Sequence, residues 1–395
     1  MASLMERQRG SVKLRFFSFS AYFWVIAAIA AAGLADSVYL SISHYRNYTD
    51  ISYRSFCAIS KAINCDTVSQ SPYAIFLGVP VPVWGVIGYA FFLGLLFLAK
   101  RRDAGRKRIW PGLFVIAAAF SSYSIILALI STFLIHSYCI MCIASYAVNL
   151  LLLYYIWLIR KRFDPGVRLM GALKQDMAYY KRHWTGTFSV LLPLGATVMA
   201  AIAFYPAYWH FSAPALRADV PTGITAEGYP WIGARKPKLE IMEFADYQCF
   251  QCRKMHFFLR ELINKYPHKI RLIQRQFPMD NRLNPLVKEP FHLNSGKMAL
   301  MAEYAKFKGK FWQMNDLLFQ LAGKKYINTR KIGAKTGMDY RMLAAAFRIP
   351  ALRYAVKHDI AVGIKLGIRG TPGFVIDGKV YQGNIPPEIL RKVTG

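Results

Sequence analysis

Hydrophobic residues are gathered into five long runs in the first half of the chain, and short polar or charged stretches separate them. The runs cover residues 16–40, 79–99, 113–135, 139–159 and 187–209. About 20 apolar residues in a helix cross the roughly 30 Å hydrocarbon core of a bilayer. Because a helix also satisfies its own backbone hydrogen bonds there, each run predicts a membrane-spanning helix. The third and fourth runs are so close that they predict a tight helical hairpin.

The second half of the chain lacks such runs and has the pattern of a soluble domain. A β-type run at 238–244 is followed by a helical run at 255–265, which is typical of an α/β fold. The segment 210–235 is rich in Pro, Gly and Ala and predicts a linker. The predicted organisation is a cytoplasmic segment 1–15, an all-α transmembrane domain 16–160, a cytoplasmic loop 161–186, a fifth spanning helix 187–209, the linker 210–235 and an α/β domain 236–395.

Charge decides which way the helices face. The chain of 395 residues carries 51 Lys and Arg against 21 Asp and Glu, and 17 of the basic residues of the first half lie in 1–15, 100–108 and 160–186. The loops on the opposite side hold three: Arg46, Arg54 and Lys61. Because basic loops stay in the cytoplasm, we expect the N-terminus inside and the C-terminal domain outside. A cleaved signal peptide is an alternative for the first run, with the same orientation for the rest.

All six cysteines fall on the outer side of this topology. They form three pairs: Cys57 with Cys65 in the first outer loop, Cys139 with Cys142 at the start of the fourth span, and Cys249 with Cys252 in the outer domain. Disulfides persist outside the cytoplasm, so three structural disulfides are one interpretation. It would suit a non-enzymatic receptor or chaperone.

Two of the pairs are Cys-x-x-Cys motifs, whose short loop makes a poor structural disulfide because it constrains little of the unfolded chain. At the first turn of a helix, unsatisfied N–H groups and the helix dipole stabilise a thiolate, which favours redox chemistry. Cys249 follows a strand and precedes a helix, and Cys139 opens a spanning helix with Ser137 as its expected N-cap. The cysteines could instead be zinc ligands. The two motifs lie on different domains, however, and no His-x-x-x-His partner accompanies them, so no metal is expected.

The pair of Cys57 and Cys65 is open to two interpretations. Two cysteines eight residues apart in an exported loop are commonly structural. A loop that reaches both the mouth of the fourth span and the outer domain would instead suit a thiol relay, whose sulfurs meet each partner in turn.

The chain resembles the vitamin K epoxide reductase family, in its bacterial fused form, over residues 15–160. This resemblance lies in the loop pair Cys57 and Cys65, Ser71-Pro72, Leu77-Gly78-Val79-Pro80, and Cys139-Ile-Met-Cys142 with Tyr146 one turn later. Residues 236–390 resemble a DsbA-type thioredoxin-fold domain with a long helical insertion. Its marks are Glu243, the motif from Cys249 to Cys252, and Gly370-Thr371-Pro372 before a strand.

The resemblance implies a four-helix transmembrane bundle with a fifth linking span, joined to a thioredoxin fold. Electrons from reduced exported proteins would enter at Cys249 and Cys252, pass to the loop pair and then to the membrane motif, and reduce a lipid quinone of the ubiquinone, menaquinone or phylloquinone type. Within this chain Cys249 would attack substrate sulfur, Cys252 would resolve the mixed disulfide, Cys57 would meet the outer domain, Cys65 would exchange with Cys139, and Cys142 would face the quinone.

Supporting residues in the membrane domain each have a plainer alternative. Ser71 and Tyr146 resemble residues that orient the quinone or its neighbouring thiol. By position alone, Ser71 is a turn residue and Tyr146 belongs to the aromatic belt. Trp84, Phe91 and Phe92 would line the quinone pocket or serve only in packing and lipid contacts.

Two residues of the outer domain carry similar expectations. Glu243, if buried beneath the motif, would have a raised pKa and would take the proton from Cys252; otherwise it is a solvated strand residue. Pro372 is expected to follow a cis peptide bond, which is uncommon enough in folded chains to imply a purpose. It would place the backbone of Thr371 beside the disulfide, where an extended substrate pairs.

Two departures from the family leave the direction of electron flow open. Residues 73–99 contain no Asn, which animal members place near the second span facing the quinone, and the dipeptide Phe250-Gln251 lacks the usual His of DsbA-type motifs. The same residues would serve an oxidase that forms disulfides or a membrane-anchored reductase or isomerase. We favour the oxidase, because an interfacial dithiol beside a quinone is an electron sink.

The outer domain also carries excess positive charge. Basic and aromatic residues alternate in one stretch: Lys306, Phe307, Lys308, Lys310, Phe311 and Trp312. Such a pattern suits a nucleic-acid patch or a solvated helix face near anionic lipid, and the extracytoplasmic placement favours the lipid and no nucleic-acid partner. We expect a multi-pass protein of a bacterial inner membrane with its α/β domain in the periplasm.

Overall fold

The computed structural model describes residues 18–60, 62–99, 109–163, 169–182, 184–215, 217–323 and 327–394. The basic segments 1–15 and 100–108, and Lys61, lie outside the described residues. The chain divides into two compact units, Met1–Asn47 with Arg54–Ala207 and Tyr48–Tyr53 with Tyr208–Gly395.

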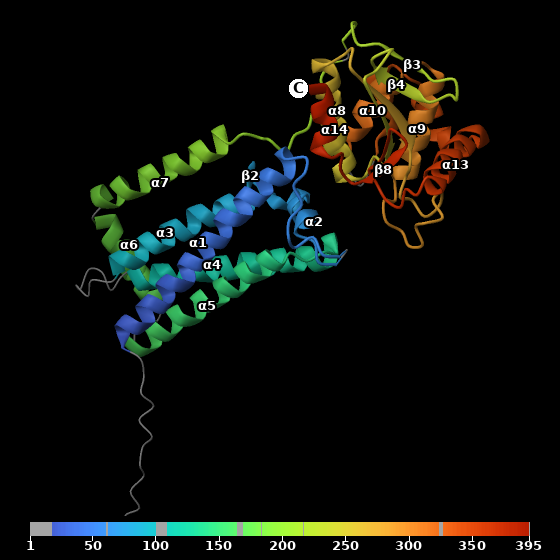
Figure 1. Cartoon of the computed structure of the whole chain (residues 1–395). Coiled ribbons are helices and arrows are strands. Elements are labelled where there is room, and N and C mark those ends of the chain that lie inside the picture. The colour runs from blue at the N-terminus through green and yellow to red at the C-terminus, as the bar shows by residue number, and fades with distance from the viewer. Residues whose placement is uncertain are drawn as a thin grey trace, which may run out of the picture. The chain divides into compact units, whose positions relative to one another are not determined.

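The first unit is helical (Figure 1). Four helices are long and apolar enough to cross a membrane: α1 (Phe19–Thr49), α3 (Val81–Ala99), α4 (Ile109–Ile130) with its π-helical continuation η2 (Ser131–Ile135), and α5 (Ile140–Phe163). They match the first four predicted runs, and η2 leads into α5 through a short connection, as the predicted hairpin requires. Next come α6 (Leu169–Arg182) and α7 (Trp184–Phe204). Because the apolar part of α7, Leu192–Phe204, is shorter, its crossing of a membrane stays a prediction.

Short elements connect α1 to α3. They are α2 (Cys65–Ser69), the 3-10 turn η1 (Pro72–Ala74) and a hairpin of β1 (Ile75–Phe76) and β2 (Val79–Pro80). Leu77 and Gly78 have φ angles of 50° and 76°, as a two-residue hairpin turn requires. This turn is the physical basis of the motif Leu77-Gly78-Val79-Pro80, since it reverses the chain directly into α3.

The spanning helices pack through a buried apolar core. Its fully buried side chains include Phe23, Ile26, Phe92, Leu96, Leu113, Leu152 and Ile156. Gly33 permits close approach of α3 to α1, because a Cβ atom at this position would lie 2.5 Å from the ring of Tyr89. Small residues at such crossings are the usual means of helix association in membranes.

The second unit is built on a six-stranded sheet. Its strands are β3 (Thr222–Ile224), β4 (Pro230–Gly233), β5 (Leu239–Ala245), β6 (Ile270–Gln276), β7 (Gly373–Ile376) and β8 (Lys379–Gln382). The strand order is β3-β4-β6-β5-β7-β8, in which β5 and β6 are parallel and the other neighbours antiparallel. Its helices are α8 (Phe250–Lys265), α9 (Ser295–Phe307), α10 (Phe311–Gln320), α11 (Thr329–Thr336), α12 (Tyr340–Ala345) with η3 (Ala346–Arg348), α13 (Pro350–Lys365) and α14 (Pro387–Thr394).

This arrangement is a thioredoxin fold with a helical insertion. The units β5-α8-β6 and β7-β8-α14 are its two halves, and α9 to α13 lie between them in the sequence. Buried apolar side chains from the sheet and from α8 form the core, among them Ile241, Phe244, Leu259, Leu272 and Phe374. The insertion is tied to α8 by Asp316, which accepts hydrogen bonds from His256 at 2.7 Å and from Arg260 at 3.1 Å.

The predicted linker at 210–235 is wrong in its second half, because β3 and β4 lie within it. Ile232 on β4 is fully buried and pairs with Leu272 on β6. Gly228 adopts a φ of 88° in the turn between β3 and β4. The Pro and Gly residues that suggested a linker are therefore the turn and end residues of a hairpin.

The basic and aromatic stretch at 306–312 does not form a single exposed patch. Phe311 and Trp312 are buried at the start of α10. The ammonium of Lys310 donates to the carbonyl of Thr336 at 2.9 Å, and Lys306 pairs with Glu303. Because base stacking needs exposed aromatic faces, this burial weakens the nucleic-acid interpretation.

Candidate functional site

The loop after α1 carries a disulfide between Cys57 and Cys65, whose Cα atoms lie 5.6 Å apart. Cys65 is the first residue of α2, and Asn64 caps that helix by accepting from the backbone N–H of Thr67 at 3.1 Å. Main-chain hydrogen bonds then fix the loop to the connection before α5. The N–H of Asn64 donates to the carbonyl of Tyr138 at 2.9 Å, and the N–H of Tyr138 donates to the carbonyl of Ala62 at 2.7 Å.

This docking brings the loop disulfide against the membrane motif. Cys57, Cys65 and Cys139 form one buried cluster, with exposed fractions of 1%, 5% and 3%. Cys142 packs against the same cluster. The thiols of Cys139 and Cys142 are free, so the cluster joins a disulfide to a dithiol.

Cys139 stands at the N-terminus of α5 and caps it with its own sulfur. The backbone N–H of Cys142 donates to the Cys139 sulfur at 3.2 Å. The expected cap, Ser137, is wrong, because its hydroxyl faces the carbonyl of Asn64 at 3.5 Å instead. Ser137 lies too far before the first turn of α5 to reach the N–H groups that a cap satisfies.

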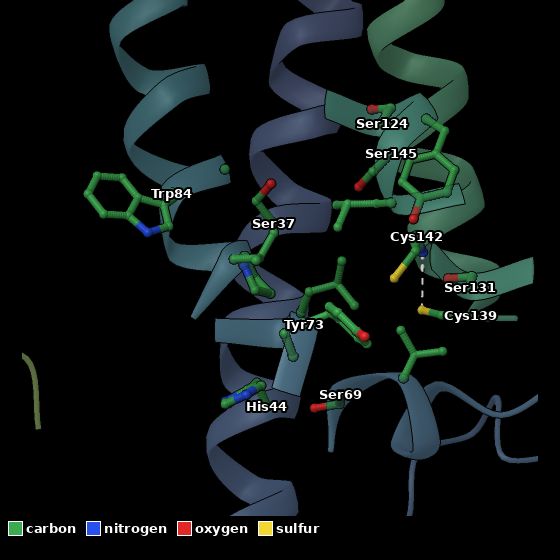
Figure 2. Close-up of a pocket in the computed structure, with 18 of the residues that line it drawn as sticks. Ser37, His44, Ser69, Tyr73, Trp84, Ser124, Ser131, Cys139, Cys142 and Ser145 are labelled. Carbon is green, nitrogen blue, oxygen red and sulfur yellow. Dashed lines mark hydrogen bonds between the residues drawn. The ribbon is translucent and has the colours of Figure 1, made fainter. Parts of the chain in front are cut away.

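A cavity of about 220 Å³ opens beside these cysteines (Figure 2). Cys65, Cys139 and Cys142 all line it, and the rest of its wall is predominantly apolar and aromatic. A mostly apolar pocket with a few fixed polar groups is the usual form of a small-molecule site.

Three residues predicted to contact a quinone line this cavity: Ser71, Trp84 and Tyr146. In Ser71 and Trp84 the polar hydrogen is already donated to a backbone carbonyl. The hydroxyl of Ser71 donates to the carbonyl of Val68 at 2.8 Å, and the indole N–H of Trp84 donates to the carbonyl of Phe76 at 2.9 Å. Phe91 and Phe92 are not in its wall; Phe92 instead fills the bundle core.

Sequence reasoning missed a polar layer on the far side of the cavity. Asn149 on α5 accepts from the hydroxyl of Tyr89 at 2.6 Å, and its amide donates to Ser124 at 2.8 Å. Ser145 on α5 donates to Asp36 on α1. The pocket thus contains an asparagine, which comes from the fourth span rather than the second. The signal was available, because Ser145, Tyr146 and Asn149 follow Cys142 at three, four and seven residues and so share its helix face.

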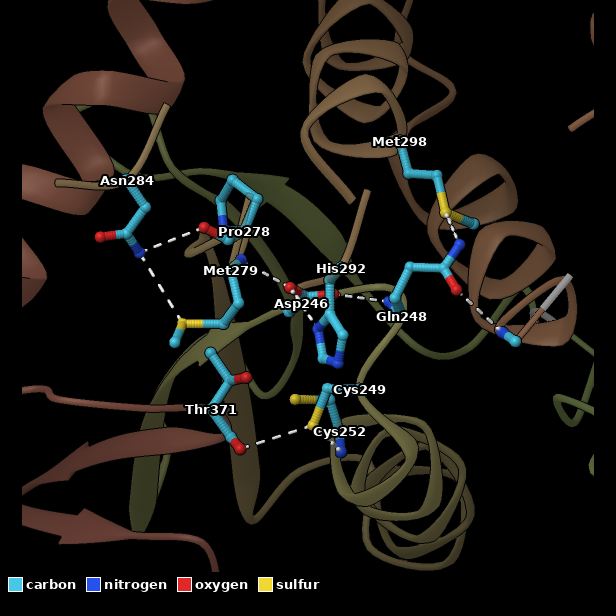
Figure 3. A network of polar contacts seen from close by, with 11 residues as sticks. Asp246, Gln248, Cys249, Cys252, Pro278, Met279, Asn284, His292, Met298 and Thr371 are labelled. Atoms are coloured by element: carbon cyan, nitrogen blue, oxygen red, sulfur yellow. Dashed lines mark hydrogen bonds and ion pairs between the residues drawn. The ribbon is translucent and has the colours of Figure 1, made fainter. Parts of the chain in front are cut away.

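The thioredoxin motif shows the same local geometry as the membrane motif. Cys249 is the N-cap of α8, and its sulfur accepts from the N–H of Cys252 at 3.2 Å. The Cys249 thiol also lies 3.4 Å from the carbonyl of Thr371 (Figure 3), and the Thr371–Pro372 bond is cis. The expected cis bond and the placement of Thr371 are therefore confirmed. Both thiols are free, with Cys249 8% exposed and Cys252 fully buried.

Electrostatics separate the two thiols. Burial disfavours the thiolate of Cys249, but a hydrogen bond from Cys252 and the charge of His292 outweigh it, so the pKa of Cys249 lies below its ordinary value. Burial, the hydrogen bond to Cys249 and the neighbouring charges of Cys249 and Glu243 hold the pKa of Cys252 well above its usual range. These shifts favour a thiolate at Cys249 and a neutral thiol at Cys252.

Glu243 lies on β5 and is completely buried. Burial, together with the nearby Cys249, raises the pKa of its carboxyl to about 8. Within the described part of the chain neither carboxyl oxygen has a hydrogen-bond partner. The alternative of a solvated strand residue is thus wrong.

His292 was not singled out by its sequence. Its Nδ1 lies 2.9 Å from a carboxylate oxygen of Asp246, and the ring sits between that carboxylate and the two cysteines (Figure 3). Asp246 is itself fixed by the N–H groups of Gln248 and Met279, both at 2.6 Å. A histidine from the segment after β6 thus lies beside a motif whose own dipeptide has none.

The match to sequence families agrees with this division of the chain. Residues 24–157 match the model of the vitamin K epoxide reductase family, and residues 225–394 match that of thioredoxin. A helical, membrane-compatible domain with two cysteine pairs, joined to a thioredoxin fold with a third, defines a membrane protein of the thiol–disulfide class. Vitamin K epoxide reductase complex subunit 1 of Rattus norvegicus is 30% identical over 134 residues, which are 31% of this chain and 80% of the rat protein. The chain belongs to the vitamin K epoxide reductase family.

Other similarities cover smaller parts. Na(+)/H(+) antiporter NhaA 1 of Salinispora arenicola is 25% identical over 160 residues, which are 40% of this chain and 23% of the antiporter, so the chain spans about a quarter of that relative's length. Among solved structures, a thioredoxin-like oxidoreductase from Silicibacter pomeroyi DSS-3 is 23% identical with a TM-score of 0.34, over 45% of this chain and 91% of that one. The strand order and the family match define the thioredoxin fold here.

Proposed function

We propose that the protein is a quinone-dependent thiol–disulfide oxidoreductase that forms disulfides in exported proteins. The packing of the Cys57–Cys65 disulfide against Cys139 carries this proposal, because Cys65, Cys139 and Cys142 line one pocket. Sulfur atoms must meet for thiol exchange, and this cluster supplies that meeting beside a site fit for an apolar acceptor.

The outer step begins at Cys249. In the disulfide form of the motif, a substrate thiolate attacks the Cys249 sulfur and releases Cys252; a second substrate thiol then displaces Cys249, and the substrate disulfide forms. The lowered pKa of Cys249 makes it the better leaving sulfur. Glu243, with its pKa near 8, exchanges the proton of Cys252 as that thiol is formed and consumed.

The inner step passes the two electrons to the membrane motif. The reduced outer pair regenerates its disulfide by reducing Cys57–Cys65. Cys65 then attacks Cys139 in a Cys139–Cys142 disulfide, and the loop disulfide re-forms as the membrane dithiol is released. Each exchange breaks one S–S bond and forms one, so electrons and protons balance at every stage.

The residues around the cavity fit a lipid quinone. When bound, a quinone supplies an acceptor for two electrons and two protons. Trp84 and Tyr146 provide flat surfaces for its ring, and the phenol of Tyr146, which also hydrogen-bonds Ser131, is the candidate donor to one of its oxygens. Ser71 cannot donate in this arrangement because its hydroxyl already bonds Val68, so its role is to shape the turn that carries Cys65.

The proposal includes a location. The four spanning helices belong in a bacterial inner membrane, and the three cysteine pairs belong on its periplasmic face, where reduced exported proteins are the substrates. This placement rests on the distribution of basic residues and on the need for one compartment to hold all six sulfurs.

The decisive experiment follows quinone consumption by purified reduced full-length protein. Cys142→Ala should abolish it, and Ile143→Ala, a control on the next residue with an exposed side chain, should not. A Cys142→Ala variant that consumes quinone as fast as the parent would refute the role of that sulfur. In cells, Cys252→Ala should accumulate mixed disulfides with exported proteins, and a complete absence of such adducts would favour structural disulfides.

A further inference from the structure

One carboxyl group lies inside the spanning helices. Asp36 is the sole Asp or Glu in α1, α3, α4, η2 and α5, and it is only 9% exposed. It accepts a hydrogen bond from Ser145 across the α1–α5 interface. Its other oxygen is buried and has no hydrogen-bond partner among the described residues.

Helix association alone does not account for this residue. An acidic side chain within a spanning helix is costly to insert, and a single interhelical hydrogen bond returns only a modest part of that cost. An intramembrane acid held in the bundle interior on such terms points to a functional role.

The position of Ser145 connects this carboxyl to the redox site. Ser145 lies one helical turn after Cys142 on α5, and both residues line the cavity (Figure 2). The hydroxyl therefore has the cavity on one side and Asp36 on the other. A hydroxyl can accept one proton while donating another, so it can pass protons between the cavity and a carboxylate.

Other titratable groups stand around the pair. Tyr89 on α3 donates its proton to Asn149, which engages that hydroxyl. Cys142 on α5 and Cys139 just before that helix line the same cavity, and so does His44, which lies about two turns after Asp36 on α1. Asp36 is the acidic group that accepts the hydrogen bond of Ser145, which lies one helical turn after Cys142.

We propose that Asp36 and Ser145 form the proton path of the membrane site, carrying protons from the Cys139–Cys142 dithiol to the acceptor in the cavity. This inference rests on the proposed function. Oxidation of the dithiol releases two electrons and two protons, and reduction of a quinone to a hydroquinone takes up two of each. The thiol of Cys142 gives its proton to the hydroxyl of Ser145 while that hydroxyl gives its own proton to Asp36. The proton held by Asp36 then returns through the Ser145 hydroxyl to a quinone oxygen.

The second proton leaves Cys139 when the sulfur–sulfur bond closes, and it follows through the same pair. Asp36 therefore begins and ends each turnover unprotonated, and Ser145 is unchanged. In this scheme Ser145 is the group that meets the acceptor, and Asp36 is the group that stores the proton.

The kinetic test uses Asp36→Asn, which keeps the size of the side chain and its ability to accept from Ser145. We expect kcat for quinone reduction to fall about 10²-fold, which is typical of a lost acid–base group, while KM and the unfolding temperature stay near those of the parent. Ser145→Ala should lose activity similarly, and Ser145→Thr, which restores a hydroxyl, should recover part of it. Ser41→Ala on α1 is the control, because Ser41 does not line the cavity and its hydroxyl bonds the backbone carbonyl of Ser37.

A kcat for Asp36→Asn within about threefold of the parent value would overturn the inference. A loss of activity that is fully explained by a smaller amount of folded protein would overturn it too. A second readout does not need quinone. Infrared difference spectra of the full chain, recorded as diamide oxidises the dithiol, should contain a carboxylic acid band that Asp36→Asn and Cys142→Ala both remove. The same spectrum in parent and Asp36→Asn would overturn the inference.

The kinetic and infrared measurements distinguish a failure of the proposed function from a failure of the proton path. If the parent protein consumes no quinone, the proposed function fails, and the infrared band still decides whether Asp36 takes up the proton. If the parent consumes quinone and Cys142→Ala does not, the function stands, and the Asp36 variants alone decide the proton path.

Discussion

Cys65 and Cys139 share one buried cluster because backbone hydrogen bonds hold their two segments side by side. Asn64 and Tyr138, the residues just before the two cysteines, are joined by an N–H to carbonyl bond of 2.9 Å. Each cysteine then begins a helix. The first residue of α2 and the N-cap residue of α5 thus lie side by side.

This geometry predicts which sulfurs exchange. In a Cys57→Ala/Cys142→Ala double variant, Cys65 and Cys139 are left without their own partners, and we expect them to form a disulfide with each other under mild oxidation. Mass spectrometry of proteolytic fragments would detect the link. The matched variant Cys65→Ala/Cys142→Ala leaves Cys57 with Cys139, and more crosslink in it than in the first would reverse the assignment.

His292 should set the reactivity of Cys249. Its charge favours the thiolate, so His292→Gln should raise the pKa of Cys249. Alkylation of the Cys249 peptide in reduced protein should then be slower at roughly pH 6, with the rate profile moved to higher pH. His268→Gln is an exposed control in the same domain. An unchanged profile for His292→Gln would show that the histidine serves only to hold Asp246.

Glu243 should make the stability of the thioredoxin domain depend on pH. Its carboxyl is protonated up to about pH 8 when folded, whereas in the unfolded chain it ionises near its ordinary value. The folded state therefore binds more protons between these two values, and the free energy of unfolding falls as pH rises through this window. The full effect has an upper bound of about 5 kcal/mol.

The variant Glu243→Gln should remove this dependence. Its free energy of unfolding should exceed that of the parent most clearly above pH 8. The difference between the two free energies should shrink as the pH falls toward the ordinary pKa of glutamate. Denaturant titrations across the window would measure it. Parallel curves for parent and variant would mean that Glu243 is not the titrating group.

Tyr146 is expected to bind the acceptor through its hydroxyl. Tyr146→Phe keeps the ring that lines the cavity and removes one hydrogen-bond donor. A single neutral hydrogen bond contributes about 0.5–1.5 kcal/mol, so KM for quinone should rise by up to about tenfold. Steady-state kinetics with varied quinone would measure this change. Tyr154→Phe, on the exposed part of α5, should leave KM unaltered.

Asn149 should contribute to the stability of the bundle. It bonds Tyr89 and Ser124 from two other helices. Because each such bond in a membrane is worth on average about 0.6 kcal/mol, Asn149→Ala should cost about 1 kcal/mol or somewhat more. Unfolding in detergent would measure the loss, and an unchanged midpoint would indicate that the network does not hold the helices together.

Much of this protein follows from its sequence because the signals are local. A spanning helix is recorded in some 20 consecutive apolar residues, and the first four runs became α1, α3, α4 and α5. The Cys-x-x-Cys spacing, the strand before Cys249 and the proline after Thr371 are likewise short patterns with their own physical causes. The error at 210–235 arose because hairpin turns and linkers use the same residues.

Local patterns in the sequence were enough to predict a membrane bundle, a thioredoxin fold and three cysteine pairs. Which groups surround those sulfurs could be known only from the packing of the chain. Asp36 meets Ser145, Asn149 meets Tyr89 and His292 meets Asp246 because helices and loops distant in sequence pack together. A side chain's proton affinity depends on burial and on neighbouring charges in three dimensions, and no spacing along the chain records either.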